Sequence, residues 1–274
     1  MNFKIFQSFY KTDQTSFLDK EFEPLDNTEN PFPNLCEFYL HRVCYKKAIK
    51  ENLDIWGLMS WRWKEKIKNL TANNIIDIVL NNPQYDCFLF NPFFKQASMC
   101  YNVWENGEAS HQNILDIIEN IFDYLKLDKN FLYYPMSINT TVYCSYVIAK
   151  KDFWEEFLTF TDSCFGVIDF LSQNIRNLFN SSAKYPNDMS LNYLSFINER
   201  LFSTFINMKN IKCYSYCNKE YDEKVSIYDK LNKIKDDAIS SKNKTILKEW
   251  IDLRNSKFSL NTDCVHRMFN SFQF

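Results

Sequence analysis

The residues best suited to chemistry lie in the stretch 54–66, which reads Asp-Ile-Trp-Gly-Leu-Met-Ser-Trp-Arg-Trp-Lys-Glu-Lys. Its apolar first half predicts a central strand that is covered on both faces. Arg62, between two indoles, and Lys64 follow directly where that strand would end. Because ligands of open α/β sheets bind beyond the carboxyl ends of strands, this cluster is a candidate site for an anion and a ring. The alternative is a core strand whose end is covered by the stems of long side chains.

Other polar side chains follow predicted strands or stand in the loops and first turns beside them. The strand predicted at 3–9 is followed by a polar loop, and the proline-rich segment 23–34 is predicted to be one long loop. A strand at 85–90 ends at Asn91, and a polar, aromatic loop is predicted at 98–108. We expect these loops to converge at one sheet edge, where their acids, amides, indoles and arginine suit a sugar and its phosphates. The candidate ligand-binding residues are Tyr10, Asp26, Asn27, Asn34, Glu37, Arg62, Lys64 and Asn91.

Hydrophobic periodicity predicts strands and helices in alternation, which is typical of an α/β protein. The strongest helix pattern spans 113–127, where apolar residues repeat along one side. Thr71 is a candidate N-cap of a short helix, and Asp152 of a longer one. Gly57, one of only three glycines, stands inside the central strand and predicts close packing there. The remaining predicted elements are strands at 141–149 and 211–216, helices at 35–52, 71–80 and 191–208, and a loop at 181–188.

The composition disfavours several classes of protein. With 32 basic and 34 acidic side chains the net charge is −2, which argues against nucleic acid as a partner. The three glycines lie too far apart for a Rossmann or Walker phosphate loop, and the sequence has no Gly-x-Ser-x-Gly elbow. Dinucleotide oxidoreductases, P-loop enzymes and serine hydrolases are therefore disfavoured. Three histidines are also few for a metal site built on imidazole.

The cysteines and the chain start predict a cytoplasmic protein. Nine scattered cysteines indicate reduced thiols, and no charged start is followed by a long apolar core. No stretch reaches the ~18 uninterrupted apolar residues that a membrane span needs. After Asn218 the composition shifts to Lys, Asp and Glu, and loosely helical apolar spacing predicts a C-terminal helical appendage at 219–274. This appendage could pack on the domain, dimerise, or touch the inner face of the membrane.

A further candidate for chemistry is Glu199, which precedes Arg200 in the middle of the helix predicted at 191–208. The acid could be functional, with the arginine as its structural partner. Alternatively, the two residues form a solvated pair on the helix surface. The spacing alone leaves both interpretations open.

Four segments, in this order, resemble bacterial glycosyltransferases encoded in capsule and lipopolysaccharide clusters. The family pattern has an Asn- and Glu-bearing loop, a strand reading roughly Asp-Tyr-Ile-Gly-Leu-x-His-Tyr-Arg-Arg, an aromatic strand and helix like 146–154, and a late Glu-Arg-Leu helix. The resemblance covers about residues 3–217, and order and spacing count for more than any one block. This chain has Ser60 where the family has His, and Trp63 where it often has a second Arg. The four segments are Leu-Asp-Asn-Thr-Glu-Asn at 25–30, Asn-Leu-Cys-Glu-Phe-Tyr at 34–39, Asp-Ile-Trp-Gly-Leu-Met-Ser-Trp-Arg-Trp at 54–63 and Phe-Ile-Asn-Glu-Arg-Leu-Phe-Ser-Thr-Phe at 196–205.

The resemblance implies a fold of the GT-A type. Residues 1–218 would form a single GT-A-like α/β domain with a mixed, mostly parallel central sheet flanked by helices, and 219–274 the helical appendage. Most such enzymes hold a divalent metal on an Asp-x-Asp motif at the end of a central strand. Here the corresponding strand ends in Ser-Trp-Arg-Trp-Lys. The resemblance therefore implies that Arg62 and Lys64 neutralise the leaving diphosphate and that no metal is bound.

The resemblance also implies roles for the acids. Glu199 becomes the candidate general base that deprotonates the acceptor hydroxyl, with Arg200 or a neighbour holding it ionised. Arg200 also joins the candidate donor-binding residues. Glu105, in the polar loop predicted at 98–108, is the second candidate base.

The expected function is transfer of a sugar from a nucleotide-sugar donor to a growing capsular or lipooligosaccharide glycan, free or lipid-linked. No cofactor is expected besides the donor substrate. The alternative is a non-catalytic carbohydrate-binding protein of the same polysaccharide assembly system. A nuclease or nucleic-acid-binding protein is a third interpretation, and the balanced charge disfavours it. The donor sugar, the acceptor and the linkage depend on pocket shape, which the residue pattern leaves open.

Overall fold

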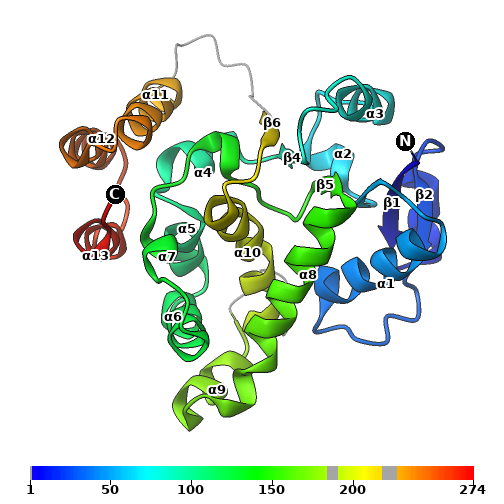
Figure 1. Ribbon diagram of the computed structural model, residues 1–274, viewed down its shortest axis with the longest axis horizontal. Coiled ribbons are helices and arrows are strands. Elements are labelled where there is room, and N and C mark those ends of the chain that lie inside the picture. The colour runs from blue at the N-terminus through cyan, green and yellow to red at the C-terminus, as the bar shows by residue number, and fades with distance from the viewer. Residues whose placement is uncertain (1, 184–190, 218–226) are drawn as a thin grey trace.

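The computed structural model describes residues 2–183, 191–217 and 227–274, and their strands form one six-stranded sheet (Figure 1). The strands are β1 (Phe3–Phe9), β2 (Glu23–Asp26), β3 (Ile55–Ser60), β4 (Cys87–Asn91), β5 (Val147–Lys150) and β6 (Cys213–Cys217). Their order is β2-β1-β3-β5-β4-β6. Strand β5 is antiparallel to β3 and β4, and the other pairs are parallel. The prediction of an α/β fold with a mixed, mostly parallel sheet is confirmed.

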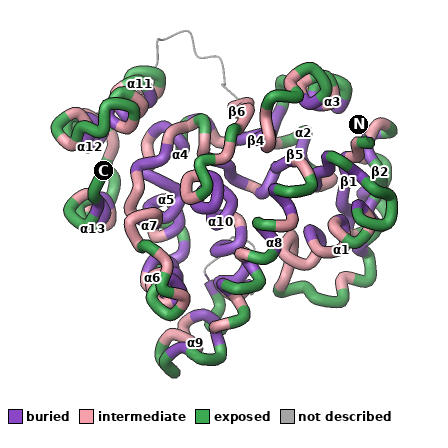
Figure 2. Tube along the Cα trace, viewed as in Figure 1, coloured by how far each residue is buried: buried purple, intermediate pink, exposed green. Residues whose placement is uncertain are grey.

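Helices cover both faces of this sheet. On one face, Trp56 and Leu58 of β3 belong to a large core cluster that includes α1 (Cys36–Lys50), α8 (Lys151–Gly166) and α10 (Tyr193–Lys209). On the other, Ile55 and Met59 pack with α2 (Trp63–Lys66) and α3 (Ala72–Leu80). Figure 2 shows burial concentrated along the sheet and α10. The remaining helices are α4 (Phe94–Met99), α5 (Val103–Ser110), α6 (Ile114–Leu125), α7 (Asn130–Tyr133), α9 (Gln173–Asn180), α11 (Ile227–Ser240), α12 (Lys244–Lys257), α13 (Asp263–Ser271) and the 3-10 turns η1 (Thr12–Phe17), η2 (Ile138–Thr140) and η3 (Ile168–Phe170).

Strand β3 lies inside the sheet, between β1 and β5, as its apolar sequence predicted. Gly57 pairs with Ile148 of β5, and a Cβ atom on Gly57 would lie 2.5 Å from Ile148 Cγ1 and 2.7 Å from the Val147 carbonyl oxygen. The prediction of close packing at Gly57 is therefore confirmed. Beside it, the indoles of Trp56 and Trp154 stack with ring centres 4.0 Å apart, which fixes α8 against the strand.

Several predicted elements match the structure in kind. The strong apolar repeat forms α6, and Thr71 caps α3 by accepting a hydrogen bond from the Asn74 amide. Asp152 is not an N-cap, because α8 begins one residue earlier and has Lys150 at the cap position. The loop predicted at 181–188 falls mostly on residues 184–190, which lie outside the described residues.

Three predicted boundaries are wrong. The segment 23–34 is not all loop, because its first four residues form β2, which pairs with β1 despite containing Pro24. The segment 98–108 is mostly helical: the Asn102 side chain accepts hydrogen bonds from the Trp104 and Glu105 amides and starts α5. The strand predicted at 141–149 begins only at Val147, since the chain turns immediately before it.

The C-terminal helices α11, α12 and α13 lie against α4, α5 and α7, on the left of Figure 1. Lys235 of α11 is buried and donates hydrogen bonds to the carbonyl oxygens of Ala97 and Cys100, both at 2.8 Å. The helical character of 219–274 is confirmed over 227–271, and a domain boundary at 218 stays a prediction. Within the described residues, no helix combines the length and apolar character that crossing a membrane requires.

Candidate active site

The carboxyl ends of five strands share one edge of the sheet. Strands β1, β2, β3, β4 and β6 all point the same way, while β5 enters from that edge. The chain leaves β1 at Tyr10, β2 at Asn27 and β3 at Trp61, and it reaches β5 through the turn at Cys144 and Ser145. Several polar segments that are distant in the sequence therefore lie at one edge, as sites in α/β proteins do.

A cluster of five side chains, the acid–lysine cluster, stands at the ends of β3 and β5: Glu37, Lys66, Cys144, Tyr146 and Glu199. The Lys66 Nζ lies 3.2 Å from Cys144 Sγ and 5.6 Å from the centre of the Tyr146 ring. The Cys144 amide donates a 2.9 Å hydrogen bond to Glu199 Oε1. All but Tyr146 are partly exposed, so a ligand can reach them.

The turn before β5, which contributes Cys144 to this cluster, has a strained backbone conformation. Cys144 and Ser145 have φ of 63° and 56°, which is the left-handed region that residues other than glycine rarely adopt. This conformation places the Cys144 amide toward Glu199. Just after the turn, the Tyr146 hydroxyl is 2.7 Å from Ser60 Oγ, which ties the turn to the end of β3. Strained backbone of this kind is concentrated at functional sites.

The charges of the cluster act on one another. Burial raises the pKa of Glu37, the charge of Glu199 raises it further, and Lys66 lowers it. Burial alone would lower the pKa of Lys66, but Cys144, Tyr146 and Glu199 bring it above its usual value. Burial raises the pKa of both the Cys144 thiol and the Tyr146 phenol to about 12. At neutral pH the cluster therefore contains one cation, two uncharged donors and two carboxyl groups.

Arg62 and Lys64, expected to neutralise a diphosphate, both have acidic partners in the structure. Arg62 Nε donates to Glu65 Oε2 at 2.7 Å, and more than half of its side chain is exposed. Lys64 pairs with the buried Asp19, which also accepts a 2.9 Å hydrogen bond from Trp63 Nε1. These contacts give Lys64 a structural role in anchoring α2. A role for Arg62 and Lys64 in binding a donor stays a prediction.

The sequence did not single out Lys66, whose charge acts on Glu37 in the structure. The signal was its helical spacing from Trp63, because residues three apart share one face of a helix. Trp63 is fully buried, so Lys66 at the other end of α2 is turned toward the sheet as well. The sequence did not single out Cys144 either, since no sequence pattern predicts a cysteine with a left-handed backbone conformation.

Glu105 and Arg200 have buried partners away from solvent. Glu105 Oε1 accepts from Arg254 Nη2 of α12 at 2.7 Å, and its Oε2 accepts from the Tyr101 amide at 2.5 Å. Arg200 donates to the carbonyl oxygens of Val103 and Phe196, at 3.0 and 2.8 Å. Both side chains thus connect helices. A role for Glu105 as base or for Arg200 in donor binding stays a prediction that these contacts do not favour.

Of the other predicted residues, Tyr10 is a neighbour of the cluster residue Glu37. Burial raises the pKa of the Tyr10 phenol, and the charge of Glu37 adds to the effect, so these two groups are neighbours. Asn91 is buried and supports the chain after β4, accepting a hydrogen bond from the Phe93 amide and donating one to the Thr141 carbonyl oxygen. Asn34 is exposed, and its carbonyl oxygen accepts a hydrogen bond from Ser195 Oγ.

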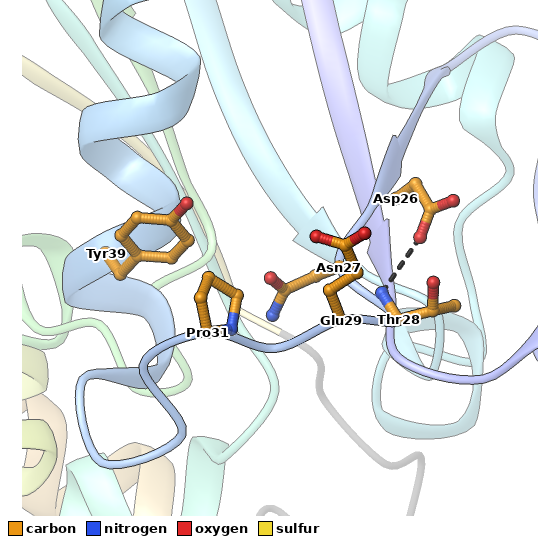
Figure 3. Close-up of a pocket in the computed structure, with 6 residues that line it drawn as sticks. All are labelled: Asp26, Asn27, Thr28, Glu29, Pro31 and Tyr39. Atoms are coloured by element: carbon orange, nitrogen blue, oxygen red, sulfur yellow. Dashed lines mark hydrogen bonds between the residues drawn. The ribbon is translucent and has the colours of Figure 1, made fainter.

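A pocket of about 200 Å³ opens beyond the end of β2 (Figure 3). In it, Asp26 Oδ1 accepts a 2.8 Å hydrogen bond from the Thr28 amide, which lowers the pKa of Asp26. Tyr39 belongs to α1, the helix that also carries Glu37, and its phenol stands on the wall of the pocket opposite Asp26. Acids, an amide and a phenol around a small hollow suit a ligand with several hydroxyl groups. The lining residues are Asp26, Asn27, Thr28, Glu29, Pro31 and Tyr39.

The described part of the chain contains no group of three or more His, Cys, Asp and Glu side chains that could hold a metal ion. Chemistry without a metal or other cofactor stays a prediction.

Comparison with protein-family models and with curated proteins gives no match. Among solved structures, the chain is similar to the WbbM bifunctional glycosyltransferase in its apo form, with a TM-score of 0.45 and 16% sequence identity. The similarity covers 80% of this chain and 46% of that protein, so the chain spans about half of its length.

Proposed function

We propose that the protein transfers a glycosyl group from a nucleotide-sugar donor to a hydroxyl group of a glycan. One observation carries the proposal: a pocket lined by acids, an amide and a phenol lies at the same sheet edge as the acid–lysine cluster, and helix α1 contributes a residue to each. Tyr39 of that helix lines the pocket, and Glu37, about half a turn away, belongs to the cluster. The four sequence segments that resemble glycosyltransferases supply most of these residues, and Lys66, Cys144 and Tyr146 join them in space.

In this proposal Glu199 is the general base. Its carboxylate takes the proton of the acceptor hydroxyl while that oxygen bonds to the anomeric carbon of the donor. The bond from the anomeric carbon to the diphosphate oxygen breaks, and the nucleoside diphosphate leaves with the electron pair. The positive charge of Lys66 lies near enough to the carboxylates to offset negative charge in the site. Arg62 and Lys64 would meet the diphosphate only by leaving Glu65 and Asp19.

The nature of the acceptor and the location of the reaction rest on the resemblance. We propose a growing capsular or lipooligosaccharide glycan as acceptor, in a reaction on the cytoplasmic side of the inner membrane. The reaction is proposed to need no metal, because the strand that resembles the metal-binding strand of most GT-A enzymes ends here in Arg62 and Lys64 and not in Asp-x-Asp. Addition of a chelator should leave turnover unchanged. A loss that Mn²⁺ or Mg²⁺ restores would contradict this part of the proposal.

A panel of nucleotide sugars tests the main proposal. A donor present well above its dissociation constant should raise the melting temperature, because it binds only the folded state. The same donor, with a glycan acceptor, should release nucleoside diphosphate and extend the glycan. If glycans stabilise the protein while no nucleotide sugar binds or reacts, the protein is a carbohydrate-binding component and the transferase proposal is wrong.

A further inference from the structure

Lys66 differs in its contacts from the other cations of its segment. The two preceding cations, Arg62 and Lys64, pair with Glu65 and Asp19. Lys66 instead turns toward the sheet edge, with its ammonium 3.2 Å from Cys144 Sγ and above the ring of Tyr146. This partly buried ammonium is held by a hydrogen bond to the thiol and by attraction to the face of the phenol ring.

Cys144 connects Lys66 to the candidate base. Its thiol contacts Lys66, while its amide donates to Glu199 Oε1 at 2.9 Å. Because Cys144 and Ser145 are both in the left-handed region, the turn needs outside contacts to keep this conformation. Lys66 and the bond from Tyr146 to Ser60 supply two of them. A displacement of Lys66 would therefore also displace the amide that orients Glu199.

We propose that Lys66 is the positioning residue of the site: it anchors the Cys144 turn that orients Glu199, and it supplies the positive charge shared by Glu199 and Glu37. The effect of Lys66 on catalysis rests on the proposed function. Its effect on the charge of Glu37 is independent of that function. The positive charge of the ammonium offsets the repulsion between the two carboxyl groups, so that both can be present in one site.

The direction of the electrostatic effect follows from the groups that face Glu37. Lys66 lowers the pKa of Glu37, whereas Glu199 raises it. Removing the ammonium should raise the pKa of Glu37, and removing the charge of Glu199 should lower it. The other titratable groups nearby are Tyr10 at the end of β1, Cys36 on α1, and Cys144 and Tyr146 before and at the edge of β5; burial keeps these thiols and phenols protonated near neutral pH.

The direct test is a pH titration of the Glu37 carboxyl carbon by ¹³C NMR, with protein labelled at glutamate. The signal is assigned by its absence in Glu37→Gln. We expect Lys66→Met to raise the titration midpoint of Glu37, because the charge of Lys66 lowers that pKa, and Lys66→Arg to restore it to near the wild-type value. Lys68→Met, which removes an exposed lysine two residues further on, is the matched control and should leave the midpoint unchanged.

A second variant keeps the test decisive. Glu199→Gln should lower the Glu37 midpoint, in the opposite direction to Lys66→Met. If Lys66→Met does not fold, as judged by circular dichroism, Lys66→Gln keeps a polar end near Cys144 and takes its place. A Glu37 midpoint that is the same in the wild type and the folded Lys66 variant would overturn the proposal.

Turnover then separates this inference from the proposed function. With the donor found in the panel, Lys66→Met should lower kcat at least tenfold with a smaller change in KM, and Lys66→Arg should recover part of the loss. A Glu37 midpoint that moves as expected in a protein that transfers no sugar would refute the proposed function and leave the electrostatic role standing. Normal kcat in Lys66→Met would overturn the positioning role even if the transferase proposal is right.

Discussion

The buried ion pair between Glu105 and Arg254 gives a prediction that separates a structural acid from a catalytic one. The two side chains are 7% and 1% exposed, and Arg254 Nη2 lies 2.7 Å from Glu105 Oε1. Among the described residues, Arg254 Nε and Nη1 have no hydrogen-bond partner. Glu105 is therefore the counter-charge of a guanidinium that belongs to the C-terminal helix α12.

We change Glu105 to Gln, which keeps the shape of the side chain and removes its charge. The variant leaves Arg254 charged and uncompensated in the core, and removal of one partner from a buried pair costs about 3–5 kcal/mol. Arg254→Met should destabilise the protein for the matching reason, because the Glu105 carboxylate then loses its cation. The double variant contains neither charge, so its loss should be smaller than the sum of the two single losses.

Urea unfolding followed by circular dichroism measures these free energies. The matched control is Asp252→Asn on the same helix, which breaks an exposed pair with Lys248 and should cost only about 0.3–0.5 kcal/mol. If the free energy of unfolding of Glu105→Gln lies within about 1 kcal/mol of the wild-type value, the argument from burial is refuted. Folded Glu105→Gln should also retain near-normal kcat; a loss of about 100-fold or more would move the role of base from Glu199 to Glu105.

Two further predictions concern the core. Gly57→Ala places a methyl group 2.5 Å from Ile148 Cγ1 and should lower the free energy of unfolding by about 1–3 kcal/mol. Gly166→Ala is the control, because a Cβ there meets no described atom within 4 Å apart from its chain neighbours and its own helix backbone, and it should leave the free energy of unfolding unchanged or raise it slightly. Equal urea midpoints for the two variants would contradict the close approach of β3 and β5. Burial lowers the pKa of His41 to about 3, while an unfolded chain binds its proton near pH 6.5. This group therefore contributes stability above pH 6.5 that is lost as the pH falls toward 3, by about 1.4 kcal/mol per pH unit. His41→Phe, which can keep the ring packing against Trp154, should flatten the fall of stability with pH, and an unchanged slope would show that His41 does not titrate in this way.

The sequence predicts those elements whose signals are local. The apolar run of β3 and the apolar stripe of α6 are readable because burial on two faces or one face leaves a periodic pattern. Thr71 is readable because a helix cap is a bond between residues three apart. Close packing at Gly57 is readable because glycine weakens a strand interior and is commonly found there where another backbone or side chain approaches closely.

What the sequence does not predict depends on contacts between distant residues. Strand β2 contains Pro24 and polar side chains, and only its pairing with β1 makes it a strand. The left-handed turn at Cys144 is stabilised by Lys66, 78 residues away, and by the hydroxyl bond from Tyr146 to Ser60. Glu105 sits in a segment with the composition of a ligand-binding loop, and its partner Arg254 is supplied by a helix near the end of the chain.

The central claim is that Glu199 deprotonates an acceptor hydroxyl during sugar transfer. The most direct measurement is the kcat of Glu199→Gln with the nucleotide sugar that stabilises the wild-type protein, read as release of nucleoside diphosphate and extension of the glycan. We predict that kcat falls by about 10²–10⁴-fold while the melting-temperature shift caused by the donor is retained. Near-normal turnover in Glu199→Gln would contradict the account.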